Sequence, residues 1–530
     1  MIASLAPGAL TGAALLLVVG GAFLGVFSVA PESDLSGLLT DRYVLSVLRF
    51  TVWQAFLSAG LSVLLAIPVA RALARRPEFP GRGLLVKALG LPMVVPTIIG
   101  VLGIVTVYGR SGIANDALGA IGIERALDIY GLPGILIAHV FFNMPFAARL
   151  LLQGWTAIPG ESWRLAAQFG MTGAQIFRLI EAPMLRRLAP GIFGLAFLLC
   201  FTSFTVVLVL GGGPPNATLE VAIYQALTFD FDLKRVLAFA VLQIMLCGVL
   251  VGLGHRLARP MAIQPTLARL DLRPDRDQRI GRIADIAAIG AGAAFLLIPL
   301  LAVFHSAATG PVLRALSYPA VWQAAGRSVA IGLSAGCLSL LLGWGIILTT
   351  RDLRTRHHRH GAADAFDLAG SLILVIPPFV IAAGLFVLLR PVADVFALAP
   401  YLVVIVNALM GLPFVLRILG PAATDAQERH LRLADSLGMH GWRRFRHVDW
   451  PLVRRPAALA LALTTALSMG DFGVIALFGS QDTATLPLVL YRQMGAYRID
   501  EAAVTGILLI AITLLLFVAI ERGLGGRADD

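Results

Sequence analysis

The sequence predicts an all-α membrane protein that crosses the bilayer about twelve times, as two tandem copies of one six-helix unit. Three observations support this fold class. Of the 530 residues, 58% are hydrophobic and only 14% are charged; apolar runs recur along the chain; and one polar pattern appears twice. A mean hydropathy of +0.84 excludes an ordinary soluble protein.

Each membrane span needs about 20 mainly apolar residues. Runs of this kind lie near residues 8–30, 50–73, 84–108, 131–153, 190–212, 236–258, 284–306, 327–349, 368–390, 398–420, 455–479 and 503–521. The third and ninth runs contain prolines, which bend helices and free backbone carbonyls. We weigh a packing kink equally against a role in gating.

The repeated pattern lies in two basic segments, residues 158–190 and 427–456, which we call the first and second polar elements. Aligning Leu165 with Leu433 superposes these further pairs: Ala166 on Ala434, Gly170 on Gly438, Met171 on Met439, Phe177 on Phe445, Arg178 on Arg446, Pro183 on Pro451, Arg186 on Arg454 and Arg187 on Arg455. The chain is therefore a duplication with two pseudo-equivalent polar elements.

Each polar element is predicted to begin with a short helix, residues 161–169 or 428–437. A glycine, Gly170 or Gly438, suits the left-handed position that ends such a helix. A second helix is expected to follow and to stop at Pro183 or Pro451. The small residues Ala166, Ala167 and Ala434 are expected to let a partner approach closely. A helix lying on anionic lipid is the alternative, but two equivalent copies favour a symmetric protein partner.

Lysine and arginine concentrate in the loops after the even-numbered spans, so the positive-inside rule places both termini and both polar elements in the cytoplasm. The net charge of +11 follows from this topology and does not indicate a nucleic-acid partner. Residues 255–282 are expected to form a solvated connector between the copies. The histidine-rich segment 351–360 could bind a metal in principle, but it lies in a basic cytoplasmic loop, which disfavours a metal site.

Several residues within the spans attract attention. Asn143 and Asn407 need hydrogen-bond partners in the membrane, and bonds between helices are favoured over substrate contact. Asp471 lies inside a span, where an acid lines a pathway or pairs with a neighbour. Cys200, Cys247 and Cys337 are interpreted as small core residues. Short helices on the outer face are predicted for 218–227 and 485–494.

The polar elements resemble the EAA loop of binding-protein-dependent ABC importer permeases, whose coupling helix docks on an ATPase subunit. The resemblance assigns coupling to these residues: Glu161, Arg164, Ala166, Ala167, Gly170, Phe177 and Pro183 in the first element, and Glu428, Arg432, Ala434, Gly438, Phe445 and Pro451 in the second. One departure is that Arg164 and Arg432 stand where the family usually has glutamate. Glu161 and Glu428 place an acid nearby but out of register.

Longer stretches, including YGLPGILIAHVFFNMPFAARLLLQ, GGGPPNATLEVAIYQALTFDFD and SMGDFGVIALFG, look like the fused permeases of bacterial importers for thiamine and thiamine pyrophosphate. Ferric-iron permeases share the fused plan and are the alternative. The resemblance implies type I permease repeats at 49–257 and 327–521. The other parts would be a first span and outer loop (1–48), a linker with the seventh span (258–326) and a cytoplasmic tail (522–530).

The same resemblance implies a bacterial inner-membrane protein whose partners are an ATPase homodimer in the cytoplasm, a periplasmic binding protein and membrane lipid. A cation such as thiamine would favour aromatic faces and an acid along its route, so Phe204, Phe472 and Asp471 are pathway candidates together with Asn143 and Asn407.

No enzymatic activity is expected of this chain. Its two lysines, Lys87 and Lys234, do not follow glycine and do not precede serine or threonine, as a P-loop requires. The chain is expected to need no cofactor, with ATP and Mg on the partner ATPase. An ion-driven secondary transporter and a scaffold without transport activity are the rivals from other classes. A secondary transporter usually has a chain of intramembrane acids, which this sequence lacks. A scaffold does not need kinked, glycine-rich spans.

Overall fold

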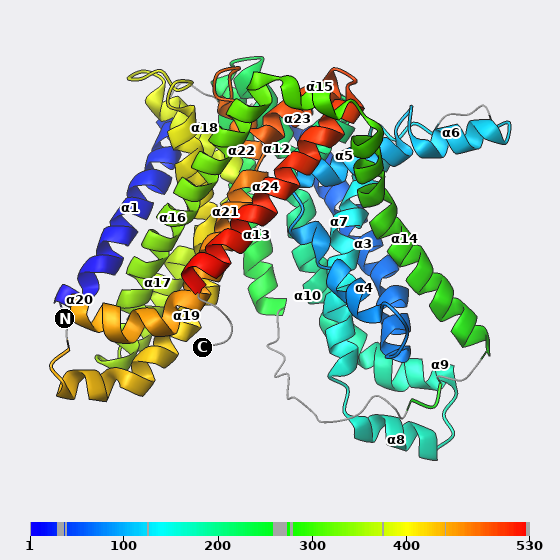
Figure 1. The fold of residues 1–530 in the computed structure, drawn as a ribbon, viewed down its shortest axis with the longest axis horizontal. Coiled ribbons are helices and arrows are strands. Elements are labelled where there is room, and N and C mark those ends of the chain that lie inside the picture. The colour runs from blue at the N-terminus through cyan, green and yellow to red at the C-terminus, as the bar shows by residue number, and fades with distance from the viewer. Residues whose placement is uncertain are drawn as a thin grey trace. The chain divides into compact units, whose positions relative to one another are not determined.

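The computed structural model describes residues 2–28, 37, 40–123, 127–257, 273–275, 279–373, 376–439 and 441–525, and every regular element among them is helical (Figure 1). The chain forms two compact units. The first-repeat unit comprises Arg42–Ala222 and Met245–Ala308, and the second-repeat unit comprises Met1–Asp41, Ile223–Ile244 and Thr309–Asp530. The boundary between them falls inside helices α12 (Leu219–Thr228) and α13 (Leu233–Leu257).

Within the described residues, 10 helices are long and apolar enough to cross a membrane. The predicted third span is split into α4 (Arg82–Ala88), a 3-10 turn (Leu91–Met93) and α5 (Thr97–Tyr108). The predicted ninth span is split into α17 (His360–Leu372) and the short apolar helix α18 (Pro378–Leu389). Prolines cause both breaks, because proline lacks the N–H that would continue the helix.

The first-repeat unit is built on α3 (Arg42–Arg75), α7 (Leu132–Thr156) and α10 (Ala182–Phe201), which pack against one another. Its other elements are α6 (Ile113–Ala120), α8 (Gly160–Gln168), α9 (Gly173–Ile176), a π-helical turn (Phe177–Glu181), α11 (Thr205–Leu210), a 3-10 turn (Pro214–Asn216) and α14 (Arg279–Thr309). Within this unit, α8 lies at the end opposite α6 (Figure 1).

The second-repeat unit has a matching core of α16 (Pro319–Thr355), α19 (Ala399–Ser436) and α21 (Trp450–Gly470). Buried side chains from all three helices meet there, among them Ile347, Val415 and Val453. The remaining elements are α1 (Ile2–Ser28), α15 (Val312–Ser317), α20 (Gly441–Arg444), a π-helical turn (Phe445–Asp449), α22 (Gly473–Phe478), α23 (Leu486–Gly495) and α24 (Ile499–Gly525).

The extra helix that precedes each repeat packs in the unit of the other repeat. Helix α1 lies against α16 and α18, where the Gly8 N–H donates to Thr349 Oγ1 at 2.9 Å. Helix α14, the predicted seventh span, lies in the first-repeat unit, where Phe295 packs edge-on against Phe141 with ring centroids 6.4 Å apart. The order of the spans along the chain does not predict this exchange.

Two local predictions have clear outcomes. The short helices expected at 218–227 and 485–494 are confirmed as α12 and α23, each displaced by one residue.

The interpretation of all three cysteines as core residues is wrong for Cys337, which is exposed, whereas Cys200 and Cys247 are buried. Cys337 lies on α16, a helix whose apolar residues face both protein and the exterior, so hydrophobicity alone did not distinguish the two sides.

Candidate functional site

The first polar element starts where α7 ends and the chain turns into α8. Trp163 and Ala166 form the buried face of α8, whereas Arg164 and Ala167 are exposed. The helix closes with a left-handed Gly170 at φ +57°. The Met171 N–H donates to the Ala166 carbonyl at 3.0 Å, and the Gly170 N–H donates to Ala167 at 3.1 Å. This pair of bonds defines a Schellman motif.

The second polar element closes its helix in the same way, although here α19 runs into the element without a break. Gly438 has φ +64°, the Met439 N–H donates to the Ala434 carbonyl at 2.9 Å, and the Gly438 N–H donates to Asp435 at 3.1 Å. The predicted left-handed glycines are therefore confirmed in both copies. Glycine suits these positions because a Cβ disfavours the left-handed conformation.

The small residues do not all face outward as expected. Ala166 is fully buried and Ala434 is 2% exposed, so both pack inside the protein, and only Ala167 of the three is exposed. The exposed faces carry larger apolar side chains at matching positions. These are Leu165 (51% exposed) and Phe169 (74%) in the first element, and Leu433 (59%) and Leu437 (64%) in the second. Each helix thus offers an apolar pair one turn apart.

The prediction that a second helix stops at Pro183 or Pro451 is wrong, because the chain remains helical through both prolines. A π-helical turn precedes each one, Phe177–Glu181 before Pro183 and Phe445–Asp449 before Pro451, and α10 and α21 then continue. A proline ring clashes with the carbonyl four residues earlier in an α-helix. The wider π turn accommodates the ring, and such turns are frequent at functional sites.

The aromatic residue that opens each π turn has a different neighbour in each copy. The Arg71 guanidinium lies over the Phe177 ring, 5.0 Å from its centroid. Phe445 packs among Trp344, Trp442 and Trp450, with ring centroids 5.7, 5.2 and 5.9 Å away.

The last residue of each π turn is a buried acid, which the sequence interpretation missed. Glu181 accepts hydrogen bonds from Arg71 Nε at 2.6 Å, Arg273 Nη2 at 2.6 Å and Trp155 Nε1 at 3.0 Å. Three segments far apart in the sequence therefore donate to one carboxylate. Charge-assisted bonds of this length are the stronger class of hydrogen bond.

Asp449 is the equivalent acid in the second polar element, and it has fewer donors. Arg351 Nη2 donates to it at 3.0 Å, and Arg444 Nε lies 3.8 Å away. The repeat alignment could have revealed both acids, because each stands two residues before its proline.

Arg273 comes from the connector between the repeats, whose expected solvation is wrong for Arg273 and Asp275. Its side chain is only 1% exposed and lies over the Trp163 ring, 4.3 Å from the centroid. Asp275 is also buried and pairs with Arg273 at 3.1 Å and with Arg75 at 3.0 Å. Burial alone raises the pKa of Asp275, but the hydrogen bond and charges of these arginines outweigh it and hold the pKa below its ordinary value.

The coupling role of the remaining candidates stays a prediction, and the structure gives only their positions. Glu161 and Glu428 are exposed. Arg432 lies within α19. Buried ion pairs of Glu181 join the first polar element to α3 and to the connector. The apolar pairs of both polar elements are exposed.

The predicted pathway residues lie at contacts between packed helices or at the start of a helix. Asn143 Nδ2 donates to Cys200 Sγ at 3.3 Å, and Asn407 Nδ2 donates to Ser468 Oγ at 2.9 Å, so each amide bonds between two helices. Asp471 accepts from the Gly473 N–H at 3.2 Å and the Val474 N–H at 3.3 Å, which satisfies the start of α22.

The two phenylalanines of the predicted pathway occupy matching places. Phe204 and Phe472 are buried just before α11 and α22, respectively. Phe472 packs against Tyr491, with ring centroids 4.9 Å apart. Buried bonds and packing thus account for these positions structurally, and their role in a pathway stays a prediction.

Residues 342–527 match the family model of the binding-protein-dependent transport system inner membrane component. The chain is also similar over its whole length to proteins described as thiamine transport system permease protein ThiP. Identity is 44% for the protein of Brucella abortus (strain 2308), covering 100% of this chain and 94% of the relative. It is 43% for Escherichia coli K12 (99% and 97%) and 38% for Haemophilus influenzae Rd (96% and 94%).

The chain belongs to this family of transport permeases. This membership agrees with the helical architecture of the chain. Binding-protein-dependent permeases work with a binding protein and an ATPase, so partners of these two kinds are implied.

Proposed function

We propose that this chain is the inner-membrane permease of a bacterial ABC importer that carries thiamine and its phosphates into the cytoplasm. Similarity to thiamine permeases over the full length carries the substrate assignment, at 44% identity with coverage of 100% of the chain. The two polar elements, each with an exposed apolar pair, support docking of two ATPase copies. ATP and Mg bind to those ATPases, because neither Lys87 nor Lys234 of this chain stands in a P-loop.

In the mechanism that we infer, each ATPase binds one polar element through its apolar pair. ATP-driven closure of the ATPases moves the two elements, and each element moves its own unit. Glu181 transmits this motion to α3 through Arg71, and Asp449 transmits it to α16 through Arg351. Pseudo-equivalent halves that move as rigid bodies expose a central path to alternate sides of the membrane. A periplasmic binding protein supplies the substrate on the outer face.

The pathway would run beside the interhelical hydrogen bonds of Asn143 and Asn407. Aromatic faces such as Phe204 and Phe472 suit a cationic vitamin, and Asp471 adds a carboxylate near α22. A tight site in the membrane is not required when the binding protein sets specificity.

The test is reconstitution of the permease with its ATPase and thiamine-loaded binding protein in liposomes, with ATP hydrolysis and thiamine uptake measured together. The decisive variant is Leu165→Asp with Leu433→Asp. Because both leucines are exposed, an acid is tolerated in the folded protein but opposes apolar docking. We expect the double variant to lose ATPase association and both activities by at least tenfold.

Ile121→Asp is the matched control, because Ile121 is 71% exposed and lies outside both polar elements. It should retain full activity. Stimulation by an iron-loaded binding protein in place of the thiamine-loaded one would overturn the substrate and keep the mechanism. Uptake driven by an ion gradient without an ATPase would indicate a secondary transporter instead.

A further inference from the structure

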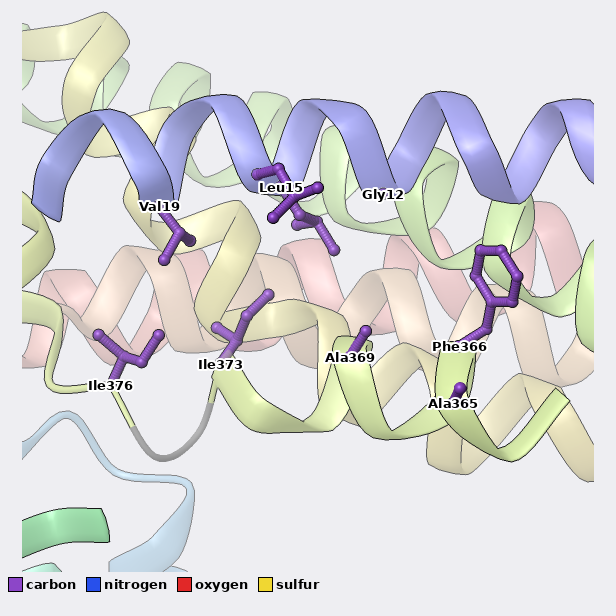
Figure 2. Close-up of a pocket in the computed structure, with 9 residues that line it drawn as sticks. Gly12, Leu15, Val19, Ala365, Phe366, Ala369, Ile373 and Ile376 are labelled. Atoms are coloured by element: carbon purple, nitrogen blue, oxygen red, sulfur yellow. The ribbon is translucent and has the colours of Figure 1, made fainter. Parts of the chain in front are cut away.

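An apolar groove of about 390 Å³ runs between α1 and α17 in the second-repeat unit (Figure 2). Gly12, Leu15 and Val19 line it from α1, and Phe366, Ala369 and Ile373 line it from the opposite side. In Figure 2 the side chains of Leu15, Val19 and Ile373 point into the space between the two chain segments. The volume lies within the range of about 300–1,000 Å³ that is usual for small-molecule pockets.

Small residues keep the groove open. A Cβ placed on Gly12 would meet no atom within 4 Å, whereas one on Gly25, farther along the same helix, would collide with the Gly384 backbone. Helix α1 therefore touches α18 closely at Gly25 and stands away from α17 near Gly12. A Cβ at position 12 would therefore enter open space.

The surroundings of the groove are those of a lipid-facing surface. The span Ala6–Ser28 has a mean hydropathy of 2.2 and is only 28% buried. Leu16, which also lines the groove, and the neighbouring Leu17 are each 76% exposed. Because the bilayer presents hydrocarbon to such a surface, the occupant that fits this groove is an acyl chain.

Among the described residues, an arginine without an ion pair lies near the end of the groove at Ala365. Helix α17 starts at His360, and Ala365 follows five residues later, roughly 8 Å along a helix at 1.5 Å per residue. His358, Arg359 and His360 are all exposed there. In the described part of the chain Arg359 takes part in no ion pair. The nearby acids Asp364 and Asp367 are already engaged by Arg354, at 2.7 and 2.8 Å.

We propose that the α1–α17 groove binds one acyl chain of an anionic phospholipid, with the phosphate beside Arg359. Hydrocarbon alone gives little selectivity, since lipid tails are equally apolar everywhere in the bilayer. The selectivity therefore comes from the headgroup, and one basic side chain near the membrane surface gives a preference of about fivefold for an anionic lipid. The positive-inside rule places this end of the groove in the cytoplasmic leaflet.

Native mass spectrometry of the purified full chain tests the proposal, with phosphatidylglycerol and phosphatidylcholine of identical acyl chains added in equal amounts. The wild type should retain one phosphatidylglycerol about fivefold more often than one phosphatidylcholine. Gly12→Phe with Ala369→Phe fills the groove and should abolish this retained lipid. Arg359→Gln should keep the bound chain but reduce the headgroup preference to about one.

Two matched controls should behave like the wild type. Leu24→Phe enlarges a 69% exposed residue of α1 outside the groove, and Arg522→Gln removes an exposed arginine from the end of α24. Unchanged lipid retention in the filled variant would overturn the groove as the site, and an unchanged preference in Arg359→Gln would overturn the headgroup assignment. If Gly12→Phe with Ala369→Phe melts early, Gly12→Leu repeats the test with a smaller side chain. The outcome does not depend on which substrate the permease carries.

Discussion

At the scale of single residues, Glu181 links the first polar element to the rest of its unit. The carboxylate is fully buried, and a buried charge is tolerated only where partners replace its lost hydration. Arg71 supplies a partner from α3 and Arg273 supplies one from the connector. Through Arg273, the connector is therefore tied to the first polar element.

We predict that Arg273→Ala destabilises the protein by about 3–5 kcal/mol, because it leaves Glu181 and Asp275 with buried charges that are only partly compensated. Thermal unfolding in detergent measures this effect. Arg110→Ala is the control, since Arg110 and Asp128 form an exposed ion pair at 3.0 Å, which contributes at most about 1 kcal/mol. Equal losses of stability in both variants would contradict the assigned role of Arg273.

At the scale of elements, the two polar elements share their helix ending and differ in how they start. Helix α8 is separate from α7, whereas α19 continues through Ser436. Pro159 lies directly before α8, and the residue before a proline resists the helical conformation. Both elements nevertheless close with the same Schellman motif, so the two apolar pairs are presented by equivalent turns.

We predict that the helix ending itself is required for coupling. Gly170→Val with Gly438→Val places a β-branched residue in the left-handed conformation, at a cost of about 1–2 kcal/mol per site. The first turn after each helix should shift, and ATP hydrolysis by the reconstituted complex should lose its dependence on the binding protein.

Gly170→Asn with Gly438→Asn is the matched variant, because asparagine tolerates the left-handed position. It should retain most of the stimulated ATPase activity. If the valine and asparagine pairs were equally active, the backbone conformation at these glycines would not matter for coupling.

At the scale of the whole molecule, the spans outside each repeat are exchanged between the compact units. Helix α1 joins the second-repeat unit and α14 joins the first-repeat unit. The α1 contact depends on close backbone approach, with Gly25 and Ala22 opposite Gly384. Small residues at such crossings allow close packing, which is a main source of helix association in membranes.

We predict that Gly384→Val separates α1 from α18 and destabilises the protein by about 1–3 kcal/mol or more, because its Cβ would collide with the Ala22 backbone. Gly20→Val on α1 is the control, since a Cβ there meets nothing within 4 Å. Thermal unfolding and protease sensitivity of α1 report the difference. A Gly384→Val protein as stable as the control would show that this crossing is unimportant.

The sequence by itself determined the helical class, the duplication, the approximate spans and the left-handed Gly170 and Gly438. These features follow from local chemistry: apolar runs, a repeated pattern and a glycine after a short helix. The same local rules were wrong at Pro183 and Pro451, because a π turn can accommodate a proline that an α-helix rejects.

Only the tertiary structure decided which unit holds α1 and α14, where Arg273 is buried, and where a groove remains beside Gly12. A membrane helix is apolar on the sides that face lipid and on the sides that face protein, so its sequence does not mark its neighbours. The partner of a buried charge is likewise fixed by contacts between distant segments, as Arg273 and Glu181 show.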